Sequence, residues 1–436
     1  MKKSLHAIRT GLPVVCFGLI QASALAGEPP VIAPAPEPAS NGDWCEWLGN
    51  KPGTLYKNSE NPFIQEFSVG GRFHWNAAYL SGDDTSGYKF SDSHTEFRRF
   101  RLNAGATVFN YFTLKAYANM VFDTTNRILA APFGGGKVRW GYHDFDQAHI
   151  TFDAKKAFGI DSVDGLSLAY GRLKNEITAE GWTSSKKLLT VERSALANKV
   201  FFGGLPTGST LSVSKGAWDF AASIYSTDAL IPLGGNTEFI GGWNDGLAYR
   251  GSVGFAATDN FRLRWDVIYN DADFNSGDDS LFRYKWVTSL SSEYSCGNWG
   301  LVTDLVYGDN GDSGNGVLNP DRQGDFWGVV VMPYYWIVED KLQGVLRYQY
   351  QGSEEDRGVR VYSRYARADH GPVVNVGQNS RGNAHHSIYG GVNYLLCGHN
   401  LKLQAGLEYE WLNVPGAGTD GDFSALTTWF GFRSYF

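Results

Sequence analysis

The chain has 436 residues, among them 53 Gly, 27 Phe, 23 Tyr and 14 Trp, and it carries a formal net charge of −7. This acidic balance argues against nucleic acid as a partner, and no stretch of about 18 apolar residues follows the N-terminus, which excludes membrane-spanning helices. Membrane-spanning strands remain possible, because a barrel strand turns only every second residue to lipid. The hydrophilic mean hydropathy of the chain, −0.28, is compatible with such strands.

Residues 1–26 have the pattern of a secretory signal peptide. They begin with the basic residues Lys2 and Lys3, continue with an apolar run at 11–20, and end on the small-residue motif Ala24-Leu25-Ala26. We therefore expect export and cleavage after Ala26. Cleavage would leave a mature chain with a net charge of about −10.

Residues 27–62 form a separate, proline-rich segment that we expect on the periplasmic side. The prolines between 29 and 38 predict an extended linker that cannot join a sheet. Trp44, Trp47 and Leu48 then form a small apolar cluster. This cluster predicts either a cap over the periplasmic mouth or a disordered tether.

Residues 63–436 are predicted to form one domain, an all-β transmembrane antiparallel barrel of about 16 strands. Apolar and polar residues alternate along segments such as 67–79 and 401–411, and each segment has about 9 to 14 residues. Tight turns alternate with long polar loops such as 271–283 and 353–383, as expected of a barrel with periplasmic turns and outer loops. A soluble β-sandwich or propeller would explain the alternation but not the aromatic faces of strand after strand.

The last strand, 426–436, indicates where the barrel resides. Phe430, Phe432 and the terminal Phe436 share one face, which we assign to lipid, whereas Arg433 shares the other face with Tyr435. In a soluble protein such an aromatic edge would invite aggregation. A terminal Phe also resembles the signal that outer-membrane assembly machinery reads, so we expect the outer membrane of a Gram-negative type of cell.

Basic residues recur on the face that these strands turn to the lumen, and guanidinium groups suit oxyanions because their planar fork donates paired hydrogen bonds. The predicted pore-lining residues are Arg72, Arg99, Arg101, Lys115, Arg250, Arg262, Arg264 and Arg347. The alternative is that acids pair with them and stiffen the wall. The acids available for this are Asp123, Asp266, Asp304, Glu408 and Glu410.

The segment 171–204 is the least strand-like part of the middle of the chain, and a loop this long usually has a function. We expect it to fold inward and narrow the channel, rather than pack on the outer rim. The predicted constriction-loop residues are Arg172, Lys174, Lys186, Lys187, Glu192 and Arg193.

Three cysteines follow the cleavage site: Cys45, Cys296 and Cys397. Cys296 and Cys397 both lie in predicted tight turns. An odd number cannot be fully paired within one chain, and an oxidising compartment permits a disulfide bond. The sequence leaves the pairing open, and none of the three has the spacing of a metal site.

Four short motifs make the chain resemble the phosphate-selective porins O and P, over roughly 60–436. They are Arg98-Arg99-Phe100-Arg101-Leu102, Gly171-Arg172-Leu173-Lys174, Thr183-Ser184-Ser185 and Glu192-Arg193-Ser194. The resemblance implies a trimeric, 16-stranded outer-membrane channel with an inward loop and an arginine-lined wall that favours anions such as phosphate. The family usually continues Lys-x-Pro-Phe where this chain has Lys174 followed by Asn175-Glu176-Ile177, a departure that bears on phosphate rather than on the channel.

Two other classes of function can be compared with the channel. An outer-membrane enzyme would have only Asp369-His370 and His385-His386 as candidates, without an activated Ser or Cys. A structural or adhesive barrel would need bulky residues in the lumen, where many small and polar ones occur. We therefore predict a porin for passive diffusion, without enzymatic activity, cofactor or metal. Its expected partners are outer-membrane lipid, small anionic or polar solutes and two further copies in a homotrimer; a weakly selective general porin is the alternative.

Overall fold

The computed structural model describes residues 45, 48, 53–121, 140–201, 205–227, 243, 246–272, 281–282, 284–311, 324–361, 365, 381–416 and 422–436. The expected signal peptide and proline-rich linker lie outside these residues. Trp44, Trp47, Asp123 and the Asp369-His370 pair lie outside them as well.

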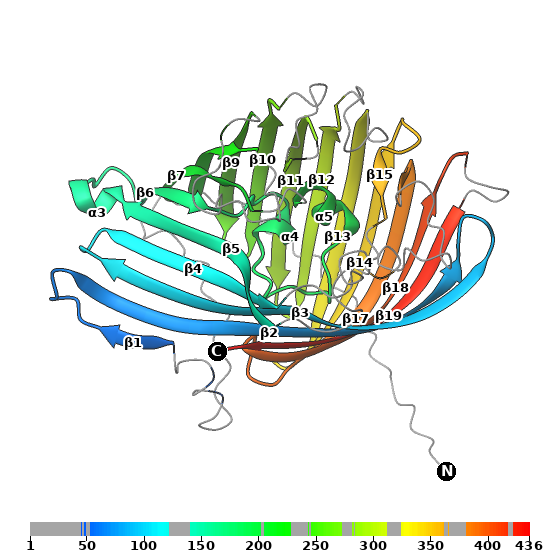
Figure 1. Cartoon of the computed structure of the whole chain (residues 1–436), viewed down its shortest axis with the longest axis horizontal. Coiled ribbons are helices and arrows are strands. Elements are labelled where there is room, and N and C mark those ends of the chain that lie inside the picture. The colour runs from blue at the N-terminus through cyan, green and yellow to red at the C-terminus, as the bar shows by residue number, and fades with distance from the viewer. Residues whose placement is uncertain are drawn as a thin grey trace, which may run out of the picture.

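Sixteen antiparallel strands form a closed barrel, which confirms the predicted fold (Figure 1). Each strand pairs with the next along the chain, and the last strand pairs with the first to close the ring. The strands are β2 (Ile64–Asp83), β3 (Lys89–Val108), β4 (Phe112–Val121), β5 (Trp140–Asp153), β6 (Gly165–Arg172), β7 (Thr207–Lys215), β8 (Trp218–Ser226), β9 (Leu247–Thr258), β10 (Phe261–Asn270), β11 (Trp286–Cys296), β12 (Trp299–Asp309), β13 (Asp325–Val338), β14 (Leu342–Ser353), β17 (Ala384–Leu395), β18 (Leu401–Asn413) and β19 (Asp422–Tyr435).

The remaining elements are short. A small sheet joins β15 (Val359–Arg360) to β16 (Arg381–Gly382), and β1 (Thr54–Lys57) precedes the barrel. The helices are α3 (Ala154–Phe158), α4 (Ala179–Trp182) and α5 (Ala195–Phe201). None of the helices in the described ranges is long and apolar enough to cross a membrane.

The first two barrel strands are longer than the sequence predicts, with 20 residues each. Their additional residues pair with one another as far as Asp83 and Lys89. Apart from the buried Leu80 and Phe90, this part of the chain is mostly polar, as in Ser91-Asp92-Ser93. The hydrogen bonds of a ladder need no apolar side chains, so a strand without hydrophobic alternation is invisible to a period-two reading.

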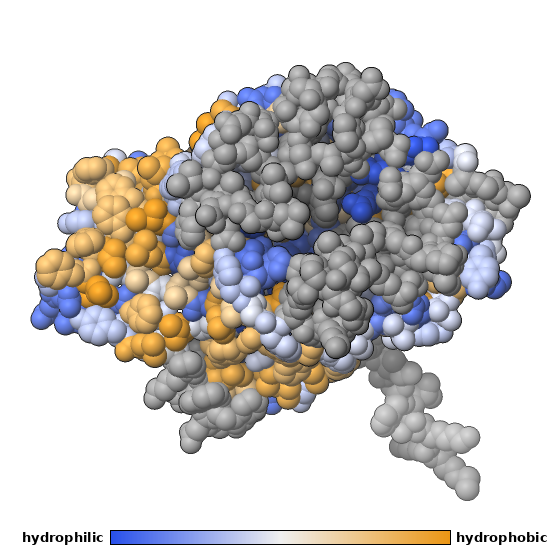
Figure 2. All heavy atoms as spheres, in the orientation of Figure 1, coloured by the Kyte–Doolittle hydropathy of each residue, from blue (hydrophilic) through white to orange (hydrophobic). Residues whose placement is uncertain are grey.

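The outer face of the barrel is apolar. Leu290, Leu346 and Leu407 are about half exposed on neighbouring regions of the wall. Exposed aromatic residues lie toward both strand ends, such as Trp218 and Trp299 at short turns and Tyr249 and Tyr269 at long loops. Figure 2 shows apolar residues gathering over the flank formed by β4, β5 and β6. An apolar band with aromatic residues at its two edges is typical of a barrel in a bilayer.

The last strand has the two faces that its sequence predicts. Phe430 and Phe436 are 40% and 38% exposed outside, whereas Arg433 is 2% exposed and faces inward. Phe436 continues the pairing of β19, because its backbone exchanges hydrogen bonds with Gly71 on β2. A Cβ atom at Gly71 would lie 2.4 Å from the Phe436 ring, so a larger residue here would displace that ring.

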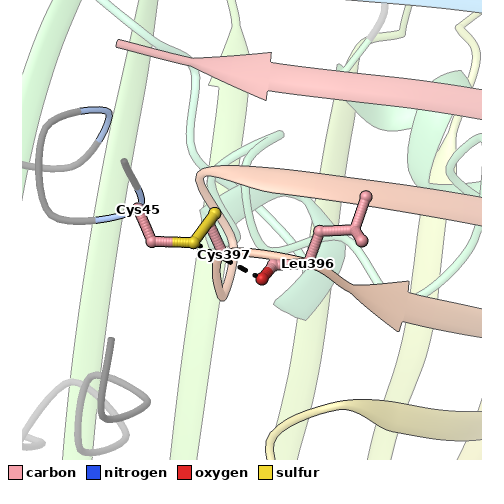
Figure 3. The surroundings of a disulfide bond; sticks show 3 residues. All are labelled: Cys45, Leu396 and Cys397. Carbon is pink, nitrogen blue, oxygen red and sulfur yellow. Dashed lines mark hydrogen bonds between the residues drawn. A yellow bond between two sulfur atoms is a disulfide. The ribbon is translucent and has the colours of Figure 1, made fainter. Parts of the chain in front are cut away.

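The segment before the barrel is attached at two points. Its end, β1, pairs with β2, so this part joins the sheet although the prolines upstream cannot. Cys45 forms a disulfide bond with Cys397 in the turn between β17 and β18, which answers the pairing that the sequence left open (Figure 3). Cys296 is free.

Candidate functional site

The connection between β6 and β7 folds into the barrel, as the sequence predicts. Its helices α4 and α5 lie within the ring of strands in Figure 1 and contact β11, β12, β13 and β14. Ile177, Leu196 and Val200 on this connection are fully buried. A loop on the outer rim would not bury these side chains. We call the described residues 173–201 the constriction loop.

One side of the constriction loop is held by carboxylates on the wall. The backbone N–H of Ala179, at the start of α4, donates to Asp304 Oδ1 over 2.7 Å. The indole N–H of Trp182, at the end of α4, donates to Asp266 Oδ2 over 2.9 Å. Thr178 caps the same helix, with its hydroxyl accepting from Gly181 N. Two of the acids that the sequence offered for wall stiffening therefore hold the loop.

Arg347 holds the middle of the constriction loop. It is 1% exposed, and its Nη1 donates to Thr190 Oγ1 over 3.1 Å and to the carbonyl of Glu192 over 2.8 Å. Ion pairs join it to Glu180 at 3.5 Å and to Glu408 at 2.8 Å. A buried guanidinium with this many acceptors fixes position, because each bond would be expensive to leave unmade.

A third group of anchors comes from the last strands. Lys402 Nζ donates to the carbonyl of Leu188 over 2.7 Å, and Arg433 Nη2 donates to the carbonyl of Val191 over 3.0 Å. Asn393 Nδ2 reaches the carbonyl of Leu189 over 2.8 Å. Arg433 and Lys402 are nearly inaccessible to solvent. They secure the loop rather than line the water path.

All eight basic residues predicted to line the pore lie on the lumen side, but five of them are paired with acids. Arg101 contacts Asp146, Arg250 contacts Asp266, Arg262 and Arg264 share Asp219, and Arg347 contacts Glu180 and Glu408. Pairing reduces the field that a passing ion meets. For these five, the wall-stiffening alternative describes the geometry well.

The other three have no ion pair with a carboxylate among the described residues. Arg72 donates to Ser185 Oγ over 2.9 Å, and its Cζ lies 5.5 Å from the centre of the Tyr117 ring. Arg99 Nη1 lies 3.3 Å from His74 Nδ1. Lys115 is exposed near a short turn. Arg72 on β2 and Arg99 on β3 lie beside the constriction loop without a direct ion pair, although Asp146 lies near both and Glu192 lies near Arg99.

Three of the six residues predicted for the constriction loop are held by neighbouring groups. Glu192 is buried and accepts from Arg98, and Arg193 is buried and donates to the carbonyls of Glu180 and Thr183. Arg172, at the end of β6, pairs with Asp144 at 3.5 Å.

The three lysines occupy different environments. Lys174 is partly buried, and burial lowers its pKa. Lys187 is exposed, and the Lys186 ammonium lies 5.7 Å from the centre of the Tyr435 ring. We call Arg72, Arg99, Lys186 and Lys187 the basic wall.

The basic wall faces carboxylates across the barrel. Its strands, β2 and β3, are separated from β10 and β11 by half the ring. Asp266 on β10 and Glu293 on β11 lie on that opposite side. Arg250, Arg262 and Arg264 lie there too, so that side carries charges of both signs.

Sequence reasoning missed one functional arginine, Arg98. A β-bulge between β2 and β3 skips it, with His74 paired to Arg99 and Trp75 paired to Phe97. Arg98 therefore points inward next to Arg99, and its Nε lies 2.7 Å from Glu192 Oε1. The sequence held a sign of this bulge. In a regular strand, residues three positions apart point to opposite faces, yet Phe97 and Phe100 are both aromatic and both face lipid.

His385 and His386, the other candidates for an enzyme, contact neighbouring side chains of the barrel wall. His385 Nε2 lies 3.1 Å from Glu410 Oε2, and its Nδ1 lies 3.0 Å from Gln351 Nε2. His386 stacks on Trp411 on the outer face. Within the described ranges, no three His, Cys, Asp or Glu side chains are grouped so that they could hold a metal ion.

The ion pair of Glu192 predicts how the constriction responds to acid. Burial alone would raise the pKa of Glu192, but Arg98 and Arg99 lower it to about 2. Because the folded pKa lies below the ordinary value of about 4.3, this pair stabilises the loop fully above about pH 4.3 and is lost as the pH falls through about 2. Current noise in a planar bilayer should therefore change near pH 2, and Glu192→Gln should remove that transition. A transition centred near pH 4 would contradict the pairing.

Comparison with known proteins agrees with this geometry. The model of the family described as phosphate-selective porin O and P matches residues 67–257. The chain resembles this porin family from β2 to β9, a range that includes the constriction loop. A comparison with curated protein sequences gives no match.

Solved porin structures share the fold of this porin-like chain. The outer-membrane channel DcaP of Acinetobacter baumannii is 13% identical, with 87% of this chain and 99% of that chain covered and a TM-score of 0.52. OprB of Pseudomonas putida is 12% identical, with 84% and 94% covered and a TM-score of 0.54. An anion-selective porin from Comamonas acidovorans is 11% identical, with 85% and 99% covered and a TM-score of 0.51. The chain therefore has the fold of these porins, and its β2-to-β9 part is similar to the family.

Proposed function

We propose that this protein is a porin that passes small hydrophilic solutes down their gradients and prefers anions. The observation that carries the preference is the basic wall, where Arg72 and Arg99 lie beside the constriction loop without a direct ion pair to a carboxylate among the described residues. A fixed positive charge lowers the barrier for an anion and raises it for a cation. The fold similarity to a porin named as anion-selective adds support of a general kind.

The proposal is tested by ion reversal potentials of single channels in a planar bilayer under a salt gradient. We expect the potential to have the sign of an anion-preferring pore, with a larger deviation at low ionic strength, where exposed charges are less screened. A clear cation preference would overturn the anion proposal. A chain that inserts as a folded barrel and conducts no ions would overturn the channel.

A weakly selective general porin is the second candidate function. The observation in its favour is that five of the eight lumen arginines and lysines first identified are paired with acids. Phosphate as the preferred anion is a further part of the proposal, and the resemblance to the family is its support. Inhibition of chloride current by millimolar phosphate would distinguish a phosphate site from general anion preference.

Cleavage of the signal peptide, which the sequence implies, and the homotrimer, which the resemblance implies, can both be tested by mass spectrometry. Denaturing mass spectrometry of protein purified from outer membranes should give the mass of residues 27–436, and native mass spectrometry in detergent should give three copies. A retained N-terminus would contradict the signal peptide. A folded monomer would contradict the trimer without affecting the channel.

A further inference from the structure

The edge of β2 has three successive partners. From Asp83 to Arg72 it pairs with β19. At Gly71 it pairs with the terminal residue, Phe436. Beyond the C-terminus, Val69 N donates to the carbonyl of Gly53 over 2.7 Å, and β1 then covers residues 66–68. In this way β1 extends the line of β19 and covers the part of the β2 edge that β19 does not pair with.

The same segment is attached on the other side of the C-terminus. Cys45 is bonded to Cys397, and the Cα atoms are 5.3 Å apart. The turn that carries Cys397 also holds the last strand, because Tyr435 N donates to the carbonyl of Asn400 over 2.8 Å. Figure 3 shows Cys45 against this turn. The two attachment points therefore lie on the two sides of the β19–β2 seam.

The two attachments can coexist only in a closed barrel. In a flat sheet of sixteen strands, β2 and the β17–β18 turn would lie about 65 Å apart, at about 4.8 Å per strand. With β1 docked on β2, the nine residues from Cys45 to Thr54 span at most about 32 Å. Cys45 could not then reach Cys397 until the ends of the sheet had met.

We propose that Cys45 and β1 together act as a lock that seals the short-turn end of the seam after the barrel has closed. Docking of β1 covers the exposed edge of β2, which would otherwise be a site for pairing with another chain. The thiols of Cys45 and Cys397 then each lose a proton and together pass two electrons to a protein disulfide oxidant, which is reduced to its dithiol. The bond makes the closed seam covalent.

The order of events is tested by refolding the reduced mature chain into detergent with oxidised glutathione. Samples are quenched with a thiol-reactive maleimide and run without heating, so that folded and unfolded barrels separate. We expect the Cys45–Cys397 bond only in the folded band, and Tyr56→Pro, which disrupts β1, should slow its appearance. Formation of the bond at equal rates in both bands would overturn the order.

The effect of the lock is tested on the folded protein. Cys45→Ala, and reduction of the folded wild type by a phosphine, should each lower the temperature of conversion to the unfolded band by several degrees, with conductance unchanged. Cys296→Ala is the matched control, because Cys296 ends β11 beside a short turn and is free. An unchanged conversion temperature in both the variant and the reduced protein would overturn the lock.

Discussion

Replacing Arg72 and Arg99 together by glutamine should remove most of the anion preference of the channel. Two unit charges about 4 Å apart interact by about 1 kcal/mol in water and more where water is displaced, and 1.4 kcal/mol is a factor of ten. We therefore expect the ratio of anion to cation permeability to fall about fivefold to thirtyfold. Reversal potentials in a planar bilayer measure this ratio directly.

The matched control is a pair whose removal leaves the net charge unchanged. Arg101 Nη1 lies 2.5 Å from Asp146 Oδ2 on the lumen side, so Arg101→Gln with Asp146→Asn deletes one charge of each sign. We expect this double variant to keep the selectivity of the wild type. If the Arg72 and Arg99 variant also kept it, the basic wall would be structural and the weakly selective porin would be the better description.

Replacing Arg347 by methionine should release the constriction loop. The substitution removes four bonding partners at once and leaves the buried Glu180 and the partly buried Glu408 without this counter-ion. Breaking a buried ion pair by removing one partner costs about 3–5 kcal/mol, which is enough to favour other loop positions. Single-channel recordings should show higher mean conductance and more current noise than the wild type.

Two further variants show whether the charge or the hydrogen-bond geometry of Arg347 matters. Arg347→Lys keeps the charge but cannot reach all four acceptors, so it should give an intermediate current noise. Arg347→Met combined with Glu180→Gln and Glu408→Gln removes the uncompensated carboxylates and should recover part of the loss. A quiet channel of wild-type conductance in Arg347→Met would mean that the anchors from β10, β12, β18 and β19 suffice.

The barrel was predictable because its strands repeat one physical rule. A strand between lipid and water must alternate, and 426–436 does so with aromatic residues on one face and Arg433 on the other. Alternation did not predict the polar ends of the two long strands or the bulge at Arg98. The spacing of Phe97 and Phe100 would have revealed the bulge, since strict alternation cannot send both to lipid.

The constriction was predictable only in part. The length and irregularity of 171–204 predicted an inward loop, and the loop is inward. What holds it could not be predicted, because its anchors come from strands far along the chain, such as Arg347 and Lys402. Lys402 and Arg433 have the same alternation as other lumen residues, so nothing local marks them as anchors.

By itself, the sequence determined that this protein is a barrel with an apolar exterior and a basic set of lumen residues, because alternation is a local property of each strand. Only the tertiary structure decided which of those charges form ion pairs with acids. Arg99 and Arg101 lie two residues apart on one strand face, yet Arg101 is 2.5 Å from Asp146 and Arg99 has a histidine as its neighbour. The field in the lumen depends on distances between charges from different strands, and closing the barrel sets those distances.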